Sequence, residues 1–194
     1  MTKMKLETER LILREWRKTD VDDLVEGLND LNVSKWLAFV PHPYTKKDAE
    51  WWINRCKTDA KKGKERDTYN LAIELKSEKK AIGGIGLDKI NRFQGTAGGG
   101  IWLNANYHRR GYGPEAWGAR LEFAFNKLKL RRIENGFFRG NSCSFKMQKR
   151  FGFKIEGLRR KGYRCMADGK LKDEYITALL KEEWDPSLGK GIKG

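Results

Sequence analysis

Alternation of apolar and polar positions along the chain predicts several strands. Tyr69, Leu71, Ile73 and Leu75 occupy every second position of one segment, which is the period of a half-buried strand. Asp168-Gly169 separates two further strand-like runs and is typical of a type I′ hairpin turn. Strands are expected over residues 9–16, 81–87, 96–103, 132–138, 153–157, 160–166 and 171–180.

A period of 3.6 residues predicts four helices. The first is expected just after Thr19, a candidate N-cap residue. The second has a capping box formed by Thr45 and Asp48. The third is expected to begin at Pro114, because a missing N–H costs nothing at the first helical position. The fourth is expected over residues 142–150.

This element order predicts an α/β chain whose sheet is mixed and mostly antiparallel. Hairpin-like strand pairs surround one central β-α-β unit, whereas a doubly wound fold would alternate strands and helices throughout. Since no repeat or linker interrupts the pattern, residues 1–184 are expected to form a single domain. The remaining residues, 185–194, are expected to form a flexible C-terminal tail.

Composition excludes some classes of protein and favours others. Aromatic residues make up 11% of the 194 residues, too many for a disordered chain. No run of eighteen uncharged apolar residues is present, and the first residues lack the apolar core of a signal peptide. We therefore expect no membrane association. The net charge of +15 favours anionic partners such as phosphorylated cofactors or nucleic acid.

Cysteine and histidine usage argues against disulfide and metal sites. Cys56, Cys143 and Cys165 are odd in number and far apart in sequence, which is typical of a reduced, cytoplasmic protein. With only two histidines, His42 and His108, no metal site is expected.

The segment with the clearest chemistry connects a predicted strand to the helix near Pro114. Gly111 and Gly113 let the backbone turn several N–H groups toward one point. The helix N-terminus adds about half a positive charge, and Arg109 and Arg110 add two whole charges. This combination predicts a phosphate-binding loop.

Two other phosphate-binding motifs do not fit this segment. The P-loop pattern GxxxxGK[ST] is absent. Residues 111–116 match the dinucleotide pattern GxGxxA, but that pattern follows its strand directly, whereas residues 104–110 intervene here. A nicotinamide cofactor is therefore disfavoured.

The loop and two other motifs together resemble the GNAT superfamily of N-acetyltransferases, in particular its RimJ/RimL-like branch of ribosomal-protein acetyltransferases. Residues 7–14 (ETERLILR) are similar to the opening strand of that branch, and residues 107–116 (YHRRGYGPEA) to its pyrophosphate loop. Residues 141–144 (NSCS), 150–153 (RFGF) and 156–157 (EG) are similar to a later segment. The resemblance covers almost the whole chain. One departure is His108, where the superfamily usually has Gln or Arg.

The resemblance implies that acetyl-CoA is the cosubstrate and that no metal is required. Backbone N–H groups from Arg109 to Gly113 would hold its pyrophosphate, and Arg109 and Arg110 would supply the charge that His108 lacks. The pantetheine arm would enter between two splayed parallel strands, like an added strand. The cofactor-binding residues implied in this way are Trp102, Leu103, His108, Arg109, Arg110, Gly111, Tyr112, Gly113, Asn141, Ser144, Phe145 and Lys146.

Acetyl transfer requires a neutral amine and a protonated leaving thiol. Ser144 is the leading candidate to protonate the thiolate, and Tyr163 or Tyr175 is an alternative acid. Glu156 is a candidate base, acting directly or through water. Cys143 lies beside this position but is expected to be a small buried residue.

The expected acceptor is a primary amine of a protein or peptide, most simply an N-terminal α-amine of the ribosomal-protein type. At pH 7 about one α-amine in seven is neutral, against about one lysine in 2,500. Polyamines and aminoglycosides are a lesser option, because polycations need an acidic pocket and this chain is basic. A basic RNA- or ribosome-binding module without catalysis is the alternative class. Either a monomer or a homodimer is compatible with the sequence.

Overall fold

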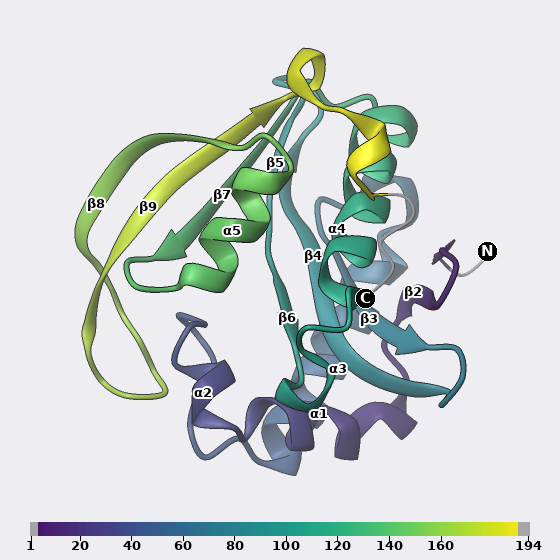
Figure 1. The fold of residues 1–194 in the computed structure, drawn as a ribbon. Helices are drawn as coiled ribbons and strands as arrows, with labels where there is room; N and C mark the ends of the chain where they lie inside the picture. Colours follow the sequence, from purple (N-terminus) through teal and green to yellow (C-terminus); the bar gives the residue numbers. More distant parts are fainter. Residues whose placement is uncertain (1–3, 190–194) are drawn as a thin grey trace.

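The computed structural model describes residues 4–189 and shows one sheet with helices on both faces (Figure 1). The strands are β1 (Lys5–Glu7), β2 (Leu11–Glu15), β3 (Tyr69–Leu75), β4 (Lys80–Asn91), β5 (Thr96–Gly98), β6 (Ile101–Leu103), β7 (Arg132–Phe138), β8 (Lys154–Arg164) and β9 (Leu171–Leu180). The α-helices are α1 (Val21–Leu28), α2 (Leu31–Ser34), α3 (Lys46–Lys61), α4 (Tyr112–Glu122) and α5 (Ser142–Arg150).

The nine strands follow the order β1-β2-β3-β4-β5-β7-β9-β8, and β6 pairs with β4 beyond the end of β5. The β5–β7 pair is parallel, whereas the other pairs are antiparallel. The predicted mixed, mostly antiparallel sheet with one parallel pair is therefore confirmed. The extents predicted for β7, α5 and β9 are also those observed.

Several predicted elements differ in detail. Residues 96–103 form two strands, because the chain changes direction at Gly99 (φ 130°). The two strands expected at 153–157 and 160–166 are the single strand β8, which is bent by bulges. In the hairpin turn Gly169 has a positive φ but Asp168 does not, so the turn is not type I′.

Two helix starts were also predicted wrongly. Thr19 lies inside a 3-10 turn, and Asp20 occupies the N-cap position of α1. The Asp20 carboxylate is buried and bound by Arg14, which the local pattern does not reveal. Helix α4 begins at Tyr112 rather than Pro114, after Gly111 in the left-handed conformation. The capping box of Thr45 and Asp48 is confirmed.

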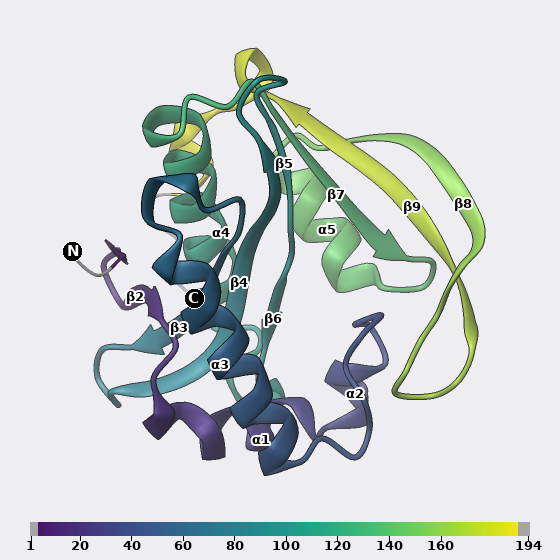
Figure 2. The ribbon, with the colours of Figure 1, turned by 180° about the vertical axis from the view of Figure 1, so that it is seen from behind.

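Helices divide the sheet into two faces. Helices α1 and α3 pack on one face of β2–β4 around Trp16, Leu24 and Ile53 (Figure 2). Helix α4 packs on the opposite face, where Trp117 and Leu121 enter a core shared with residues of β4 and β7. Helix α5 lies on the same side as α4.

Part of the C-terminal segment that was expected to be a flexible tail lies within the described residues. Residues 186–189 form a 3-10 turn, and Leu188 packs against the α4 core. The rest of the predicted tail, 190–194, lies outside the described residues. Within residues 4–189, no helix is long and apolar enough to cross a membrane.

Candidate functional site

The parallel strands β5 and β7 separate soon after they meet. They pair at Thr96–Arg132 and Ala97–Ile133, after which β6 follows β4 instead. A side chain at Gly99 would collide with the carbonyl oxygen of Gly86, so the close approach that diverts the chain requires glycine. The edge of β6 and the edge of β7 from Glu134 onward therefore face each other, and among the described residues no strand pairs with either edge in the space between them. We call this the strand opening.

Arg120 of α4 closes the inner end of the strand opening. Its Nη2 donates to the Gly98 carbonyl oxygen at 3.1 Å and to Asn135 Oδ1 at 3.2 Å, which links β5 to β7. Burial lowers the pKa of Arg120 to about 10, against the opposing effect of the Asp88 carboxylate. Sequence analysis missed this residue, because an arginine in the middle of an amphipathic helix normally faces solvent.

The loop before α4 presents unpaired backbone donors. Arg109 and Gly111 both have positive φ angles, 61° and 79°. The backbone N–H groups of residues 109–113 have no hydrogen-bond partner among the described residues. Five free donors at a helix N-terminus, beside two exposed arginines, form an anion-binding arrangement.

The N-terminal segment fixes this loop from below. The Glu115 carboxylate accepts from Thr8 Oγ1, the Arg10 N–H and Arg10 Nε at 2.6–2.8 Å. Arg10 also donates to the Arg110 carbonyl oxygen at 3.0 Å. Because residues 8–10 bind both the loop and the first turn of α4, the free N–H groups have a rigid base.

His108 has a structural contact of its own. Its Nε2 lies 3.0 Å from the carbonyl oxygen of Leu103, the last residue of β6. The imidazole is exposed and joins the strand end to the loop. The guanidinium of Arg110 stacks 5.6 Å from the Tyr107 ring, while Tyr107 itself hydrogen-bonds to Glu78.

The two predicted residues of β6 face opposite sides of the sheet. Trp102 stacks on Trp16 with ring centroids 6.5 Å apart, and packs against Gly27 of α1. Leu103 faces α4, where its side chain lies near Gly113. Met147 of α5 lies next to the same glycine, because its Cε atom would be 3.1 Å from a Cβ atom added to Gly113. The predicted loop, β6 and α5 therefore meet at one place.

The start of α5 holds Ser144 in a defined position. Asn141 caps the helix by accepting from the Ser144 N–H at 3.1 Å, as expected. The Ser144 Oγ accepts from Gln148 Nε2 at 3.0 Å, and buried Gln148 accepts from Thr177 of β9. No described residue accepts the Ser144 hydroxyl proton. Gln148 was missed, although its i+4 spacing from Ser144 predicts contact on a helix.

The other predicted residues of α5 lie outside the core. Phe145 is partly exposed and contacts Phe137 of β7 with ring centroids 5.8 Å apart. Lys146 is exposed. Cys143 is also exposed, so its predicted burial is wrong. Its position on the open side of a helix that carries few apolar residues explains the difference.

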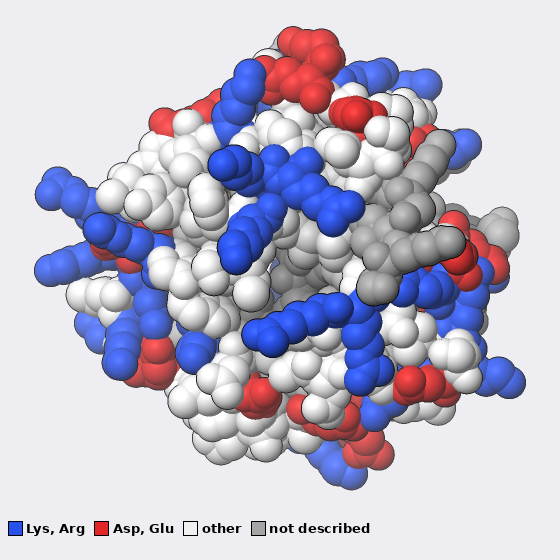
Figure 3. All heavy atoms as spheres, viewed as in Figure 1, with Lys and Arg blue, Asp and Glu red and all other residues white. Residues whose placement is uncertain are grey.

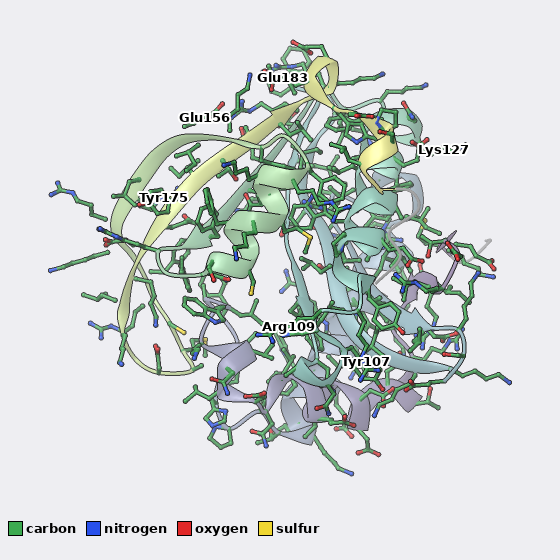
Figure 4. All side chains as sticks on the ribbon, viewed as in Figure 1. Tyr107, Arg109, Lys127, Glu156, Tyr175 and Glu183 are labelled. Atoms are coloured by element: carbon green, nitrogen blue, oxygen red, sulfur yellow. The ribbon has the colours of Figure 1, made fainter. Side chains whose placement is uncertain are left out.

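Glu156 is not brought to the strand opening. It lies on the upper part of β8, far from Arg109 (Figure 4). Arg132 binds both of its carboxylate oxygens, and this hydrogen bonding lowers the pKa of Glu156. Because its pKa is lowered and it lies away from the strand opening, the geometry does not favour the predicted role of Glu156 as a base. Tyr175 faces α5 and packs on Phe137, whereas Tyr163 lies on the opposite face.

Basic side chains border a depression between α4 and α5. The space-filling view shows this hollow at the centre of the face, with Lys and Arg side chains above and below it (Figure 3). Arg109 lies at its lower edge. Among the described residues, no cluster of His, Cys, Asp and Glu is suited to hold a metal ion.

Comparison with known proteins identifies the family. Residues 10–154 match the acetyltransferase (GNAT) domain. The chain belongs to the GNAT acetyltransferase family. It is 32% identical to the uncharacterized N-acetyltransferase YnaD of Bacillus subtilis, over 94% of this chain and all of that protein. This GNAT protein is accordingly an acetyl-transferring enzyme.

Solved structures share its fold. RimJ of Mycobacterium smegmatis, in complex with CoA-disulfide, superposes with a TM-score of 0.77 at 19% identity, covering 89% of this chain and 83% of that one. Ribosomal-protein-S5-alanine acetyltransferase of Vibrio fischeri superposes with a TM-score of 0.74 at 21% identity, covering 94% and 100%. At these identities the likeness concerns the fold.

Proposed function

We propose that this enzyme transfers acetyl from acetyl-CoA to the N-terminal α-amine of a protein. The observation that carries the donor assignment is the row of free N–H groups at residues 109–113, next to Arg109 and Arg110. A diphosphate needs several donors and positive charge in one place, and this loop supplies both. The cytoplasm, where the three cysteines stay reduced, is the proposed compartment.

The strand opening suits the pantetheine arm of acetyl-CoA. A pantetheine arm carries two amides, and the unpaired edges of β6 and β7 offer backbone groups to them as a neighbouring strand would. Leu103 and Gly113 would line the entry, and Trp102 would support β6 from behind. Asn141, Ser144, Phe145 and Lys146 would flank the arm from α5.

Ser144 is the proposed acid for the leaving group. Gln148 holds its oxygen as an acceptor, so its proton is free to be donated to the departing thiolate. The neutral amine nitrogen bonds to the acetyl carbon and loses one proton to water. The carbon–sulfur bond breaks with its electrons on sulfur, and the thiolate takes the serine proton, which solvent replaces.

An α-amine acceptor is favoured by proton chemistry and by charge. About one α-amine in seven is neutral at pH 7, so it needs less help from a base than a lysine does. The net charge of +15 disfavours polycationic acceptors and suits an enzyme that works near ribosomal RNA. RNA or ribosome contact is thus proposed as an aid to docking.

A charge reversal tests the donor site. R109E/R110E is expected to weaken acetyl-CoA binding at least tenfold in calorimetry, because two cations beside the phosphates become anions. R160E/K161E on the exposed hairpin changes net charge equally and is the matched control. Equal affinity in both variants contradicts the loop assignment.

A pair of peptides tests the acceptor. Thiol release from acetyl-CoA is measured with one peptide that offers only an α-amine and another that offers only a lysine amine. Release with the first alone is expected. Release with the second alone contradicts the α-amine assignment, and acetyl-CoA binding without release from either indicates another acceptor.

A further inference from the structure

The face of β7 turned away from α4 and α5 carries polar groups that the proposed function does not use. Asn135 contacts α4 and Phe137 contacts α5, so Gly136 and Phe138 point to the opposite face. In the β7–β9 register Phe138 stands opposite Glu174, which places Glu174 on that face too. We call this surface the rear face of β7, and Figure 2 views the molecule from that side.

Glu174 lies at the inner end of the strand opening. Its carboxylate rests against the backbone of Gly136, and any side chain at Gly136 would collide with it. Gly136 is two residues along β7 from Glu134. The carbonyl oxygen of Glu134 would lie 3.8 Å from a Cβ atom added to Gly98. Gly98 ends β5, the strand that leaves β7 there. The carboxylate is therefore close to where the strands separate.

Arg159 binds this carboxylate directly, and Tyr163 and Lys89 add two further polar groups to its surroundings. Arg159 Nη1 of β8 donates to Glu174 Oε2 at 2.7 Å and lies 3.1 Å from the Tyr163 hydroxyl oxygen. The charge of Lys89 on β4 also acts on Glu174. Burial nevertheless raises the pKa of Glu174, outweighing both cations. With 16% of its side chain exposed, Glu174 is shielded yet remains accessible to a ligand.

An aromatic wall stands beside Glu174. The Tyr163 ring packs on Phe138 and Phe39 with centroids 5.9 Å and 5.7 Å apart. The hairpin that carries Tyr163 is tied to the segment before α3 by the Met166 N–H, which donates to the Ala38 carbonyl oxygen at 3.1 Å. Phe39 is 74% exposed, so this wall has an apolar surface available to a ligand.

Acetyl-CoA bound at the loop before α4 would occupy the α4–α5 side of the sheet. The rear face of β7 would then remain for the acceptor amine. We propose that Glu174 binds the acceptor ammonium on the rear face of β7 and takes its proton before attack on the acetyl group. This inference rests on the proposed function. One ammonium proton moves to the Glu174 carboxylate, and the freed electron pair attacks the acetyl carbon. The nitrogen then loses its second proton to water, and the thiolate leaves with the carbon–sulfur electrons.

The neighbouring cations restrict the acceptor class. Arg159 binds the carboxylate and the charge of Lys89 also acts there, so an amine with further positive charges nearby is repelled. The aromatic wall of Tyr163, Phe138 and Phe39 suits an uncharged or apolar chain next to the amine. The site therefore takes a singly charged primary amine, such as the N-terminus of a neutral peptide, in preference to spermidine.

The test compares E174Q with E156Q, which removes a carboxylate held by Arg132 away from the strand opening. The acceptor is a neutral pentapeptide amide with a free α-amine, and its kcat/KM is measured from pH 6.5 to 9.5. E174Q is expected to lose on the order of a hundredfold at pH 7. The loss should shrink toward pH 9.5, where the amine is already neutral. E156Q is expected to stay within twofold of wild type.

A binding measurement separates this inference from the proposed function. Acetyl-CoA affinity of E174Q, measured by calorimetry, is expected to equal that of wild type and confirms folding. Peptide affinity for the enzyme–CoA complex is expected to fall at least fivefold in E174Q. If wild type acetylates the peptide and E174Q equals it in both measurements, the Glu174 assignment is overturned while the function stands. If wild type neither binds nor acetylates the peptide, both are overturned.

Discussion

In the loop before α4 the polar groups belong to the backbone of consecutive residues, whereas on the rear face of β7 they are side chains of several strands. Residues 109–113 contribute five N–H groups from one stretch of chain, which residues 8–10 support. Glu174 and Arg159 come from β9 and β8 and are brought together by the pairing of these strands, and the charge of Lys89 on β4 also acts on Glu174.

This difference has a chemical reason. A diphosphate is the same in every turnover, so a fixed array of backbone donors recognises it, and glycine is the main requirement. An acceptor amine must lose a proton, which demands a side chain whose pKa is adjusted by its surroundings. We therefore expect the loop to be sensitive to backbone changes and the rear face to be sensitive to side-chain changes.

The largest expected effect comes from Gly111→Pro. Gly111 has φ 79°, whereas proline fixes φ near −65°, so the loop cannot keep its donors together. A conformational penalty of about 3 kcal/mol corresponds to roughly a hundredfold weaker acetyl-CoA binding. Gly169→Pro is the control, since Gly169 also has a positive φ but lies in the hairpin turn. Unchanged acetyl-CoA affinity in Gly111→Pro would show that the backbone of this loop does not determine acetyl-CoA binding.

The next largest effect is expected from a substitution on the rear face of β7. Gly136→Ala places a methyl group where the Glu174 carboxylate lies, and is expected to lower kcat/KM for the acceptor about tenfold. Donor affinity should not change. Gly157→Ala is the matched control, because its methyl group would meet only Ile176 Cδ1, at 3.9 Å. Equal kinetics for the two alanine variants would place the acceptor elsewhere.

Ser144→Ala is expected to have a smaller effect on turnover. A thiol has a pKa near 8.5 and its anion leaves readily, so help from an acid is worth about tenfold or less. Acetyl-CoA affinity should stay within twofold of wild type. Ser142→Ala, at the exposed start of the same helix, serves as the control. A loss of affinity with normal kcat would make Ser144 a binding residue.

The smallest expected effect concerns stability. Burial alone would raise the pKa of Glu115, but hydrogen bonds from Thr8 and Arg10 outweigh it and lower the pKa. Its stabilisation is therefore present above the ordinary carboxyl pKa and lost as pH falls through the lowered value. Glu115→Gln should cost about 1–2 kcal/mol at pH 7.

Urea unfolding at pH 7 and pH 3.5 measures this difference in free energy. The gap between wild type and Glu115→Gln should narrow at pH 3.5. Glu122→Gln, an exposed position on the same helix, should cost less than about 0.5 kcal/mol at either pH. A pH-independent gap would mean that Glu115 stabilises the loop through packing alone.

Much of the fold follows from local patterns. The extents of β7, α5 and β9 and the capping box at Thr45 were all predicted, because each depends on periodicity or on residues adjacent in sequence. The glycines and arginines of the loop are contiguous and precede a helix, so the proposal that it binds phosphate could be made from the sequence.

What could not be predicted depends on contacts between distant segments. The kink at Gly99 follows from the nearness of Gly86, and the N-cap position of α1 is held by Asp20, whose carboxylate is bound by Arg14. The pairing of Glu156 with Arg132 arises from the curvature of β8, a strand whose bulges carry no local signature. Similarly, the sequence around Glu174, which follows Asp173 in a predicted strand, does not distinguish it from an ordinary surface carboxylate.

The short contact between β5 and β7 also has a mechanical consequence. The described ladder has two residue pairs, reinforced by Arg120, so the two halves of the sheet share few backbone hydrogen bonds. We expect such a junction to bend more easily than the rest of the sheet, and a ligand that bridges both edges of the strand opening to stiffen it. Amide hydrogen exchange at residues 96–98 and 134–136 then slows when the donor binds, and the two halves unfold more cooperatively.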